Sequence, residues 1–263
     1  MDPKQLFEAG ELTKAIEAMT ALVKAQPADA ARRTFLFELL SFAGEWDRAR
    51  KQLDVISHQS SQAEWAVSVY GHLIDAEQAR RKFFAEGKPP EFLLDIPEHI
   101  QQHLAAAAQL AAGRAGEAAA TLAAAADSTP AVSGTVNGRP FAEARDCDDL
   151  LAPVLELFIV HDYVWVPLTQ LRSLEIAPPE RPRDLLWTPV RIALSDGVQR
   201  SGYLPTTYFG SAQQADEALK LGHATDWRGA DGAPVQGLGQ HQYLFDDAEL
   251  GLLEIRKLEI AAS

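Results

Sequence analysis

The side chains best suited to acid–base chemistry are His161, Asp162 and His241. A histidine that is oriented by a carboxylate can act as a general base if both lie within hydrogen-bond reach of the substrate. A nucleophile to go with them is not identifiable, because neither Ser201 nor Ser211 stands in a Gly-x-Ser-x-Gly motif. A hydrolase with a cleft formed by these two histidines and the aspartate is one hypothesis for the function.

The one cysteine, Cys147, stands between Asp146 and Asp148. Adjacent carboxylates disfavour the thiolate that nucleophilic catalysis requires. A single cysteine also excludes an intramolecular disulfide and a cysteine-based zinc site in this sequence. We therefore expect an unreactive thiol. Because no further oxygen ligands stand at a defined spacing, we expect Asp146, Asp148 and Asp149 on the solvated surface or at a helix N-terminus.

His99 and His103 are four residues apart, which places them on one face of a helix where a pair of histidines can hold a metal. The intervening residues are Ile100, Gln101 and Gln102, so the sequence has no HExxH pattern here. We expect two exposed histidines and no metal ion.

The stretch GLGQ at residues 237–240 is the one glycine pattern that resembles part of a nucleotide fingerprint. It has neither the third glycine nor the strand-to-helix setting of a dinucleotide-binding motif. We expect no cofactor.

The charge of the chain argues against nucleic acid and membrane as partners. The 263 residues carry a formal net charge of −13, and the densest group of arginines and lysines is diluted by acidic residues. Such a surface repels phosphate backbones and anionic lipids. No stretch reaches the roughly 20 apolar residues that span a bilayer, and no signal-peptide core is visible. We expect a cytoplasmic protein.

The elements that position these residues differ between the two halves. In the first half, a pattern of small and large apolar residues at helical spacing recurs after 34 residues. A 34-residue helical hairpin whose first unit ends in proline resembles the tetratricopeptide repeat (TPR). The matched pairs are Gly10 with Gly44, Leu12 with Trp46, Ala15 with Ala49, Met19 with Leu53, and Leu22 with Ile56.

This pattern predicts six or seven helices within residues 3–126, stacked as a short solenoid domain over residues 1–127. Such solenoids present a concave groove to a peptide or helix of a partner. On this interpretation Phe35, Leu39 and Trp46 are candidate partner-binding residues. A plain helical bundle with an accidental period remains the alternative.

A second domain is predicted over residues 134–263. The change from alanine-rich helix to the sequence DSTPAVSGTVNG at residues 127–138 marks the boundary. Asn137-Gly138 and Asp196-Gly197 are hairpin signals between apolar stretches. Strands joined by tight turns form antiparallel sheets, so we expect an α+β fold overall, with an antiparallel α+β second domain.

One internal similarity indicates a barrel-like arrangement of that sheet. Residues 168–177, LTQLRSLEIA, and residues 252–261, LLEIRKLEIA, are identical at six of ten positions. We infer one strand-forming unit used twice, as equivalent strands of a small barrel. Chance similarity between two amphipathic strands is the alternative, because period-2 patterning alone forces some identities.

The ordered motifs of the second half resemble the ImpE family, also called TagJ, an accessory family of bacterial type VI secretion systems. The helical first half, with PEFLLDIP at residues 90–97, is also similar, so the resemblance covers nearly the whole chain. The motifs are GTVNGRPF (134–141), DYVWVP (162–167), RDLLWTP (183–189), YLPTTYFGS (203–211), ATDW (224–227), GLGQ (237–240) and LLEIRKLEI (252–260).

The residues that carry the resemblance have a structural interpretation. Tryptophans are usually buried in cores or interfaces, and prolines end strands or lie at sheet edges. We therefore expect a structural role for the motif residues Trp165, Pro167, Trp187, Pro189, Pro205, Thr206, Tyr208, Gly210, Asp226, Trp227, Gly237, Gly239 and Gln240.

The resemblance implies a non-enzymatic adaptor. Proteins of this family are expected to contact the contractile sheath through its smaller subunit, and the AAA+ ATPase that recycles the sheath. The sequence departs from the family pattern at Thr207, Phe209, Gly222-His223-Ala224 and His241. We expect these positions on the surface, where their charge would tune the choice of partner. A structural oligomer subunit is a third hypothesis, beside the adaptor and the hydrolase.

Overall fold

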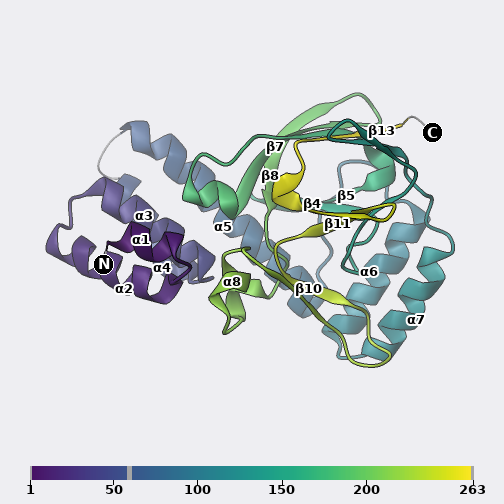
Figure 1. The fold of residues 1–263 in the computed structure, drawn as a ribbon, viewed down its shortest axis with the longest axis horizontal. Helices are drawn as coiled ribbons and strands as arrows, with labels where there is room; N and C mark the ends of the chain where they lie inside the picture. Colours follow the sequence, from purple (N-terminus) through teal and green to yellow (C-terminus); the bar gives the residue numbers. More distant parts are fainter. Residues whose placement is uncertain (1, 58–60, 262–263) are drawn as a thin grey trace.

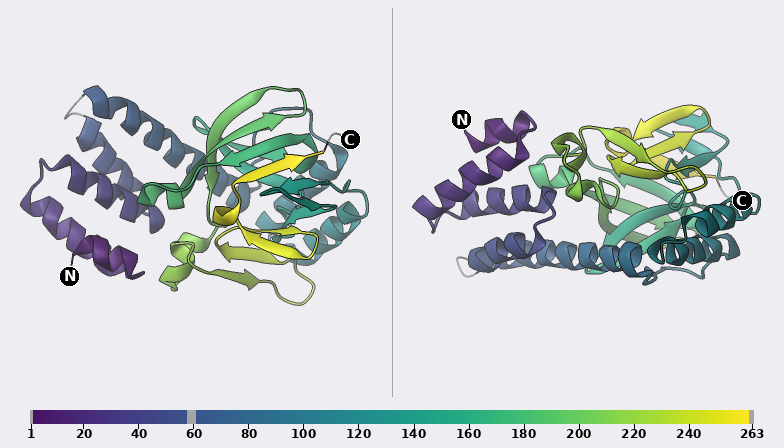
Figure 2. Two further views of the ribbon diagram at one scale, coloured as in Figure 1. Left: turned by 45° about the horizontal axis from the view of Figure 1, so that its top comes forward. Right: turned by 90° about the horizontal axis from the view of Figure 1, so that it is seen from below.

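The computed structural model describes residues 2–57 and 61–261. Helices form the first part of the chain and antiparallel sheets the second, with the long helix α5 running beneath both (Figures 1 and 2). The helices are α1 (Pro3–Glu8), α2 (Leu12–Ala25), α3 (Ala30–Phe42), α4 (Trp46–Ser57), α5 (Ser61–Glu86), α6 (Glu98–Ala111), α7 (Ala115–Ala126) and the short α8 (Glu217–Lys220).

The 34-residue pattern corresponds to two successive helix pairs, α1–α2 and α3–α4. Ala15 and Ala49 are both fully buried where neighbouring helices cross. Their small side chains allow the close approach of helix axes that a helical hairpin repeat needs. At the start of α3, the Asp29 carboxylate accepts a hydrogen bond from the backbone N–H of Arg32, which caps the helix as a free N-terminus requires. The N-terminal part is TPR-like, as predicted.

Three antiparallel sheets make up the second part. The largest has eight strands in the order β2-β1-β13-β6-β7-β8-β4-β5. The others pair β9 with β10, and β3 with β11 and β12. The strands are β1 (Gly134–Val136), β2 (Arg139–Phe141), β3 (Ala144–Asp146), β4 (Val154–Ile159), β5 (Asp162–Pro167), β6 (Leu171–Ile176), β7 (Trp187–Leu194), β8 (Gln199–Pro205), β9 (Thr225–Arg228), β10 (Gln236–Gly239), β11 (Gln242–Phe245), β12 (Ala248–Gly251) and β13 (Lys257–Ile260).

The predicted hairpins are present, but the barrel is not. Asn137-Gly138 joins β1 to β2, and Asp196-Gly197 lies in the turn between β7 and β8. In the described part of the chain the end strands β2 and β5 do not pair, so the expectation of a barrel-like sheet was wrong. The outer edge of β5 instead bonds to Glu91, whose N–H donates to the Tyr163 carbonyl at 2.9 Å and whose carbonyl accepts from Trp165 N–H at 3.0 Å.

The two similar stretches do form the same local structure. Each begins with a 3₁₀ turn, η1 (Leu168–Gln170) or η4 (Leu252–Glu254), and continues into a strand, β6 or β13. The two strands are antiparallel neighbours in the eight-stranded sheet, with Leu258 opposite Leu174. The shared pattern therefore describes two adjacent strands of an open sheet.

Each face of the large sheet belongs to a different core. On β5, Tyr163 and Trp165 lie in the core shared with the helices, whereas Val164 and Val166 lie in the core that includes residues of β11. This is the alternation expected of a strand that is covered on both sides. The helical core is continuous with one sheet face (Figure 2), so the two-domain division at residues 127–134 stays a prediction.

Among the described residues, none of the helices combines the length and the apolar character needed to cross a bilayer.

Candidate functional site

The three candidate partner-binding residues do not share one open surface. Leu39 is fully buried in the helical core. Phe35 is half-buried, and its ring packs edge-on against Phe7 at 6.0 Å between centroids. Trp46 is half-buried too, and it stacks on Trp187 at 6.1 Å. Phe35 and Trp46 thus keep part of their surface free, whereas Leu39 does not.

Trp187, at the start of β7, joins the helices to the sheet. Its side chain is 1% exposed and lies against Trp46 and against Phe37, 6.2 Å away. The indole N–H donates to Oε1 of Glu77 on α5 at 3.1 Å. Trp187 therefore fills the core at this junction, and its one polar atom has a hydrogen-bond partner.

Two further segments of the sheet part hold the helical part in place. Arg183, in the 3₁₀ turn η2 (Pro182–Leu185), donates to Glu38 of α3 at 2.6 Å and lies over the Tyr70 ring at 4.6 Å. Near α8, Glu217 accepts hydrogen bonds from the backbone N–H of Thr13, at 2.9 Å, and from its hydroxyl. One face of the helical repeats is therefore covered by the chain itself.

The centre of the molecule contains a buried ionic cluster built on Arg80 of α5. Its guanidinium donates two hydrogen bonds to the Glu156 carboxylate of β4, at 2.8 and 2.6 Å, and a third to the Thr207 carbonyl at 3.0 Å. Arg80 is 2% exposed and Glu156 3%. Because unpaired buried charges are costly, this bidentate pair fixes α5 on the sheet.

His241 continues the cluster between two carboxylates. We expected His241 and Thr207 on the surface, and that was wrong, because they are 1% and 8% exposed. His241 Nδ1 lies 2.9 Å from Asp146 and its Nε2 lies 3.1 Å from Glu156. Burial lowers the pKa of His241, but the two carboxylates outweigh it and raise that pKa to about 9. Burial likewise raises the pKa of Glu156, and Arg80 and His241 reverse the effect, bringing it to about 2. At neutral pH the cluster holds an imidazolium between two carboxylates.

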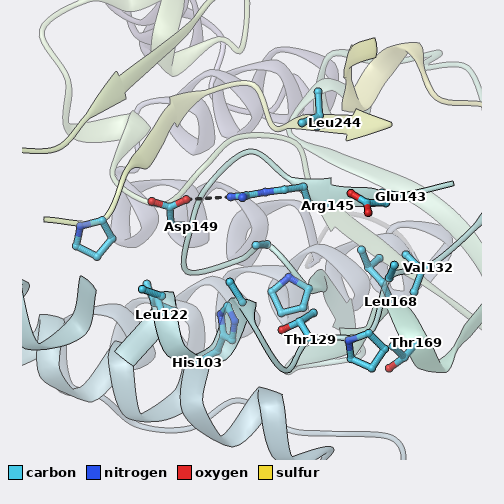
Figure 3. A pocket seen from close by; sticks show the side chains of 18 of the residues that line it. His103, Leu122, Thr129, Val132, Glu143, Arg145, Asp149, Leu168, Thr169 and Leu244 are labelled. Carbon is cyan, nitrogen blue, oxygen red and sulfur yellow. Dashed lines mark hydrogen bonds and ion pairs between the residues drawn. The ribbon is translucent and has the colours of Figure 1, made fainter. Parts of the chain in front are cut away.

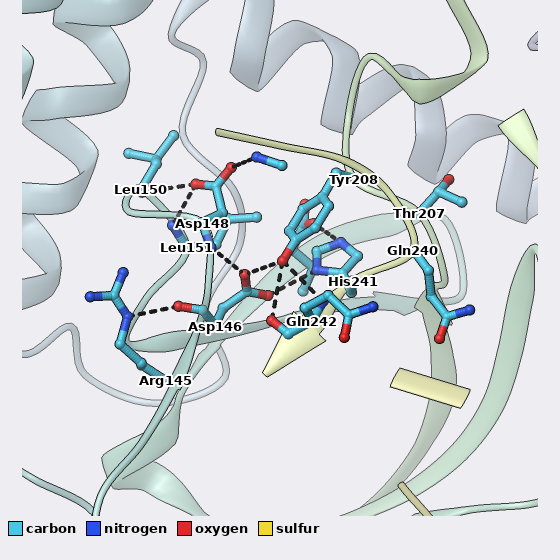
Figure 4. Close-up of polar contacts among 12 residues, drawn as sticks. Arg145, Asp146, Asp148, Leu150, Leu151, Thr207, Tyr208, Gln240, His241 and Gln242 are labelled. Atoms are coloured by element: carbon cyan, nitrogen blue, oxygen red, sulfur yellow. Dashed lines mark hydrogen bonds and ion pairs between the residues drawn. The ribbon is translucent and has the colours of Figure 1, made fainter. Parts of the chain in front are cut away.

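Two of the three aspartates that we expected on the surface, Asp146 and Asp148, are buried in this region, so the expectation was wrong for them (Figure 4). The side chain of Asp149 is 36% exposed. Asp146 is 1% exposed and accepts a hydrogen bond from the Tyr208 hydroxyl at 2.7 Å. Asp148 is 4% exposed, and its oxygens accept from the backbone N–H groups of Gly237, Leu150 and Leu151. Burial and the charge of Asp146 raise the pKa of Asp148 to about 7. These hydrogen bonds replace those that water would make to the two carboxyl groups, which lowers the free-energy cost of burying them.

The hydrolase hypothesis fails on geometry. His161 and Asp162 lie at the exposed β4–β5 turn, 3.5 Å apart, whereas His241 is 1% exposed and bound to Glu156. The extended strand from Glu156 to Ile159 alone spans about 10 Å, and His161 lies in the turn beyond it. Proton transfer requires hydrogen-bond reach, so the three side chains do not form one catalytic site.

Cys147 has the unreactive environment expected of it, since burial and the Asp146 charge raise the pKa of its thiol to about 12. The expectation for the histidine pair was wrong, because His99 is 6% exposed and His103 3%. Both lie on α6 facing the sheet part, where the Leu150 carbonyl accepts from His103 Nδ1 at 2.7 Å. No group of three or more metal-ligand side chains occurs among the described residues.

The motif residues of β5, β7 and β8 extend the cluster. The Trp165 indole donates to the Tyr163 hydroxyl at 2.6 Å, and this hydroxyl donates to Glu156 at 2.6 Å. Thr206 is fully buried, and its hydroxyl lies 3.0 Å from that of Thr188. The prolines stand within or at the end of strands: Pro167 opposite Val154, Pro189 opposite Tyr203, and Pro205 opposite Trp187.

The remaining motif residues surround Tyr208. Gly237 lies so close to the Tyr208 ring that a Cβ would come within 2.3 Å of it, and a Cβ on Gly239 would come within 1.9 Å of the Ala224 carbonyl. Larger residues at either position would displace the tyrosine or the strand. Gln240 donates to the Gly222 carbonyl at 2.8 Å. Three more motif residues lie in this region. Gly210 precedes the turn η3 (Ser211–Gln213), and the carboxylate of Asp226 accepts a hydrogen bond from the Trp227 N–H at 2.8 Å. Trp227 is 39% exposed, and its ring centroid is 5.8 Å from that of Tyr208.

The sequence motifs pointed to many residues of this cluster, but they did not predict that these residues lie together around Arg80 and Glu156. Arg80, Glu77 and Glu156 carried no motif signal, because α5 and β4 are distant in sequence and neither contains a recognised motif. The one available signal was a charged residue inside an apolar stretch, as Glu156 is within VLELFI. A charge in such a position needs a partner from elsewhere in the fold.

Together, the fold and the site define a class of protein in which TPR-like helices are fixed to an antiparallel sheet by a sealed ionic core. The model of the ImpE protein family matches residues 138–259, and a tetratricopeptide repeat model matches residues 6–68. The type VI secretion system accessory component TagJ of Pseudomonas aeruginosa is 36% identical over 259 residues, which are 98% of this chain and 91% of that protein. The chain belongs to the ImpE family.

A crystal structure of a protein from Vibrio parahaemolyticus has the same fold along the whole chain. Its TM-score is 0.91 at 26% sequence identity, and the match covers 99% of this chain and 98% of that one. The arrangement of helices and sheets described above is therefore shared between two proteins of low identity.

Proposed function

We propose that this chain is a non-enzymatic accessory protein of a bacterial type VI secretion system that acts as an adaptor between proteins. The observation that carries the proposal is the 36% identity, over 98% of the chain, to a protein with the name of such an accessory component. The TPR-like helices support it, because stacked helical repeats commonly bind protein segments. The ionic core is sealed from solvent and offers no substrate access, which agrees with a binding role.

We further propose that the small subunit of the contractile sheath, the AAA+ ATPase that recycles the sheath, or both are the partners. A cytoplasmic location belongs to this proposal, since an ATPase works where ATP is present. The net charge of −13 favours partner surfaces with basic residues, because opposite charges steer association.

The helical part is the proposed contact region. Two of the candidate partner-binding residues, Phe35 and Trp46, are half-buried aromatic residues of this part. Aromatic residues are enriched in binding hot spots. Arg183 and Glu217 hold this part against the sheet, so a partner would meet a helical surface that is already positioned. Pre-positioning lowers the entropic cost of binding.

The test measures binding of the purified chain to the purified sheath small subunit and, separately, to the ATPase by isothermal titration calorimetry. We expect binding to at least one of them. Phe35→Ala is expected to weaken it about tenfold or more, as loss of a hot-spot residue does. Val160→Ser is the control, because Val160 is 58% exposed at the β4–β5 turn, outside the helical part.

Absence of binding to both components, with protein shown to be folded by circular dichroism, would contradict the adaptor role. Equal weakening by Phe35→Ala and Val160→Ser would contradict the helical contact region and leave the adaptor role standing.

A further inference from the structure

A cavity of about 480 Å³ lies between the helix pair α6–α7 and the strand β3 (Figure 3). Its volume is within the range of roughly 300–1,000 Å³ that is usual for sites of small ligands. One wall is apolar and is made by Ala119, Leu122, Ala123 and Ala126 of α7. The opposite wall carries charged side chains of the β3 region. The cavity is separate from the ionic cluster and from the helical face assigned to the partner.

The alanines of α7 explain why space exists here. An alanine side chain ends at Cβ, so it cannot reach across to β3 as a leucine or phenylalanine would. Close-packed interiors fill such gaps unless the small residues leave them. The apolar wall is therefore suited to the hydrocarbon part of a ligand.

His103 supplies one polar group at this cavity. Its side chain is 97% buried, lines the cavity and points toward it from α6 (Figure 3). Nδ1 lies 2.7 Å from the Leu150 carbonyl, which can only accept, so Nδ1 carries the proton and Nε2 is an acceptor. Burial lowers the pKa of His103 to about 4, so the ring is neutral at pH 7. Within the described residues Nε2 makes no hydrogen bond, so this nitrogen is an acceptor available to a ligand in the cavity.

The charged wall is acidic overall. Glu143, Asp149 and Asp246 line it together with a single cation, Arg145. The Arg145 guanidinium is already bound to Asp149 at 2.9 Å, so its charge is largely neutralised. Asp246 accepts hydrogen bonds from the backbone N–H groups of Ala142 and Glu143, and the Glu143 side chain has no ion-pair partner in the part of the chain described. The wall therefore favours a positive charge.

We propose that this cavity binds a small organic cation, a primary amine on an apolar body, with its N–H donating to His103 Nε2, its charge facing Glu143 and Asp246, and its hydrocarbon part against α7. A carboxylate ligand would be repelled by the acidic wall. A hydrocarbon without a donor would leave His103 Nε2 unpaired. This binding activity is additional to the proposed adaptor role and does not depend on it.

The test titrates the full chain with hexylamine, 1-hexanol and hexanoate, which share one hydrocarbon length. Two-dimensional ¹⁵N–¹H NMR reports which amides respond. We expect saturable shifts from hexylamine at α7 and β3, with hexanol at least about tenfold weaker, since it keeps the donor and loses the charge. Hexanoate is expected to be weaker still. Equal affinity for the three probes, or no saturable shift with hexylamine, would overturn the proposal.

Two variants at adjacent positions of α7, which point in different directions, locate the site. Ala123→Trp should abolish the hexylamine shifts by filling the cavity, whereas Ala124→Trp should leave them unchanged, because Ala124 is exposed and does not line it. Unaltered binding by Ala123→Trp would overturn the assignment of the site.

The polar contacts are tested separately. His103→Leu is expected to lower hexylamine affinity about tenfold by removing the acceptor. If that variant does not fold, Glu143→Gln is the deciding test, because Glu143 is exposed and its side chain forms no ion pair with any residue that the structure describes. It should narrow the preference for hexylamine over hexanol, and an unchanged preference would contradict a role for the acidic wall.

Discussion

The α5 side and the α7 side of the helical part meet the β-strands in opposite ways. On the α5 side, Arg80, Glu77 and Trp187 fill the junction, and every charge there has a partner. On the α7 side, alanines face acidic side chains across a cavity, and the His103 ring faces it with an unused acceptor. The family motif residues lie beside the first junction, and few of them touch the second.

The comparison of the two sides distinguishes buried polar groups that are fully paired within the protein from one that is only partly paired. Arg80 and Glu156 make direct, bidentate contact and hold two elements in one position. Among the described residues, one nitrogen of His103 is hydrogen-bonded and the other has no hydrogen-bond partner. Full internal pairing is characteristic of a structural core, whereas incomplete pairing beside a cavity is characteristic of a ligand site.

The largest effect is expected from Arg80→Ala. It leaves Glu156 and Glu77 without their cation inside the protein, which should lower the free energy of unfolding by about 5 kcal/mol. Urea denaturation followed by circular dichroism measures this. A loss below about 1 kcal/mol would show that the α5 junction does not depend on the ionic cluster. Arg81→Ala on the same helix is the control, because Arg81 is exposed.

Trp187→Ala should cost somewhat less, about 4 kcal/mol, through the volume lost beside Phe37 and Trp46. The loss should be seen as earlier unfolding of the sheet part in near-ultraviolet circular dichroism. Trp227→Ala provides the comparison, since Trp227 is 39% exposed and should cost about 1 kcal/mol. Equal losses in the two variants would contradict the special position of Trp187.

The pH dependence of stability should show the imidazolium of His241. Because its folded pKa, about 9, is above the usual 6.5, its contribution is fully present below pH 6.5 and is lost as pH rises through 9. The expected loss is about 3 kcal/mol. Asp148 has a pKa of about 7, so its own contribution to the pH dependence of stability falls at lower pH. The change in stability between pH 7 and pH 9 is therefore assigned to His241. Urea denaturation at several pH values measures the slope, and His241→Gln should remove it.

The smallest effect is expected when an alanine is replaced by leucine on the α5 side and on the α7 side. Ala76→Leu, at a fully buried position of α5, should cost about 1–3 kcal/mol by overpacking. Ala123→Leu on α7 should change stability by less than about 0.5 kcal/mol, because Ala123 is exposed at the rim of the cavity and a larger side chain has room there. Thermal unfolding of both variants is sufficient. A larger loss for Ala123→Leu would mean that the α7 side is packed as tightly as the α5 side.

Sequence patterns correctly predicted those elements whose structure depends on residues close together in the chain. The recurrence of Ala15 at Ala49 predicted the helix pairs, and Asn137-Gly138 predicted the β1–β2 hairpin, because both depend on residues close in sequence. The open edge of the sheet was not predictable from period-2 patterning, since Glu91 reaches β5 from the loop after α5.

The site was predictable only in part. Tyr208 and Trp187 stood out through motifs, but their partners Asp146 and Glu77 lie far along the chain. His103 was expected in solvent because helical spacing shows which residues share a face and not what covers that face. The Leu150 carbonyl that covers it comes from the sheet part.

The place of β13 in the sheet bears on how the molecule assembles. This strand lies between β1 and β6, with Ile260 opposite Gly134, so the two ends of the sheet part must meet before the β1–β2 hairpin gains its neighbour. The helix pairs α3–α4 and α6–α7, by contrast, form contacts between adjacent elements. Contacts between distant residues form slowly and local ones rapidly. The repeats are therefore expected to reach their native arrangement first, while the hairpin and the strand that pairs with it join late, in one concerted step.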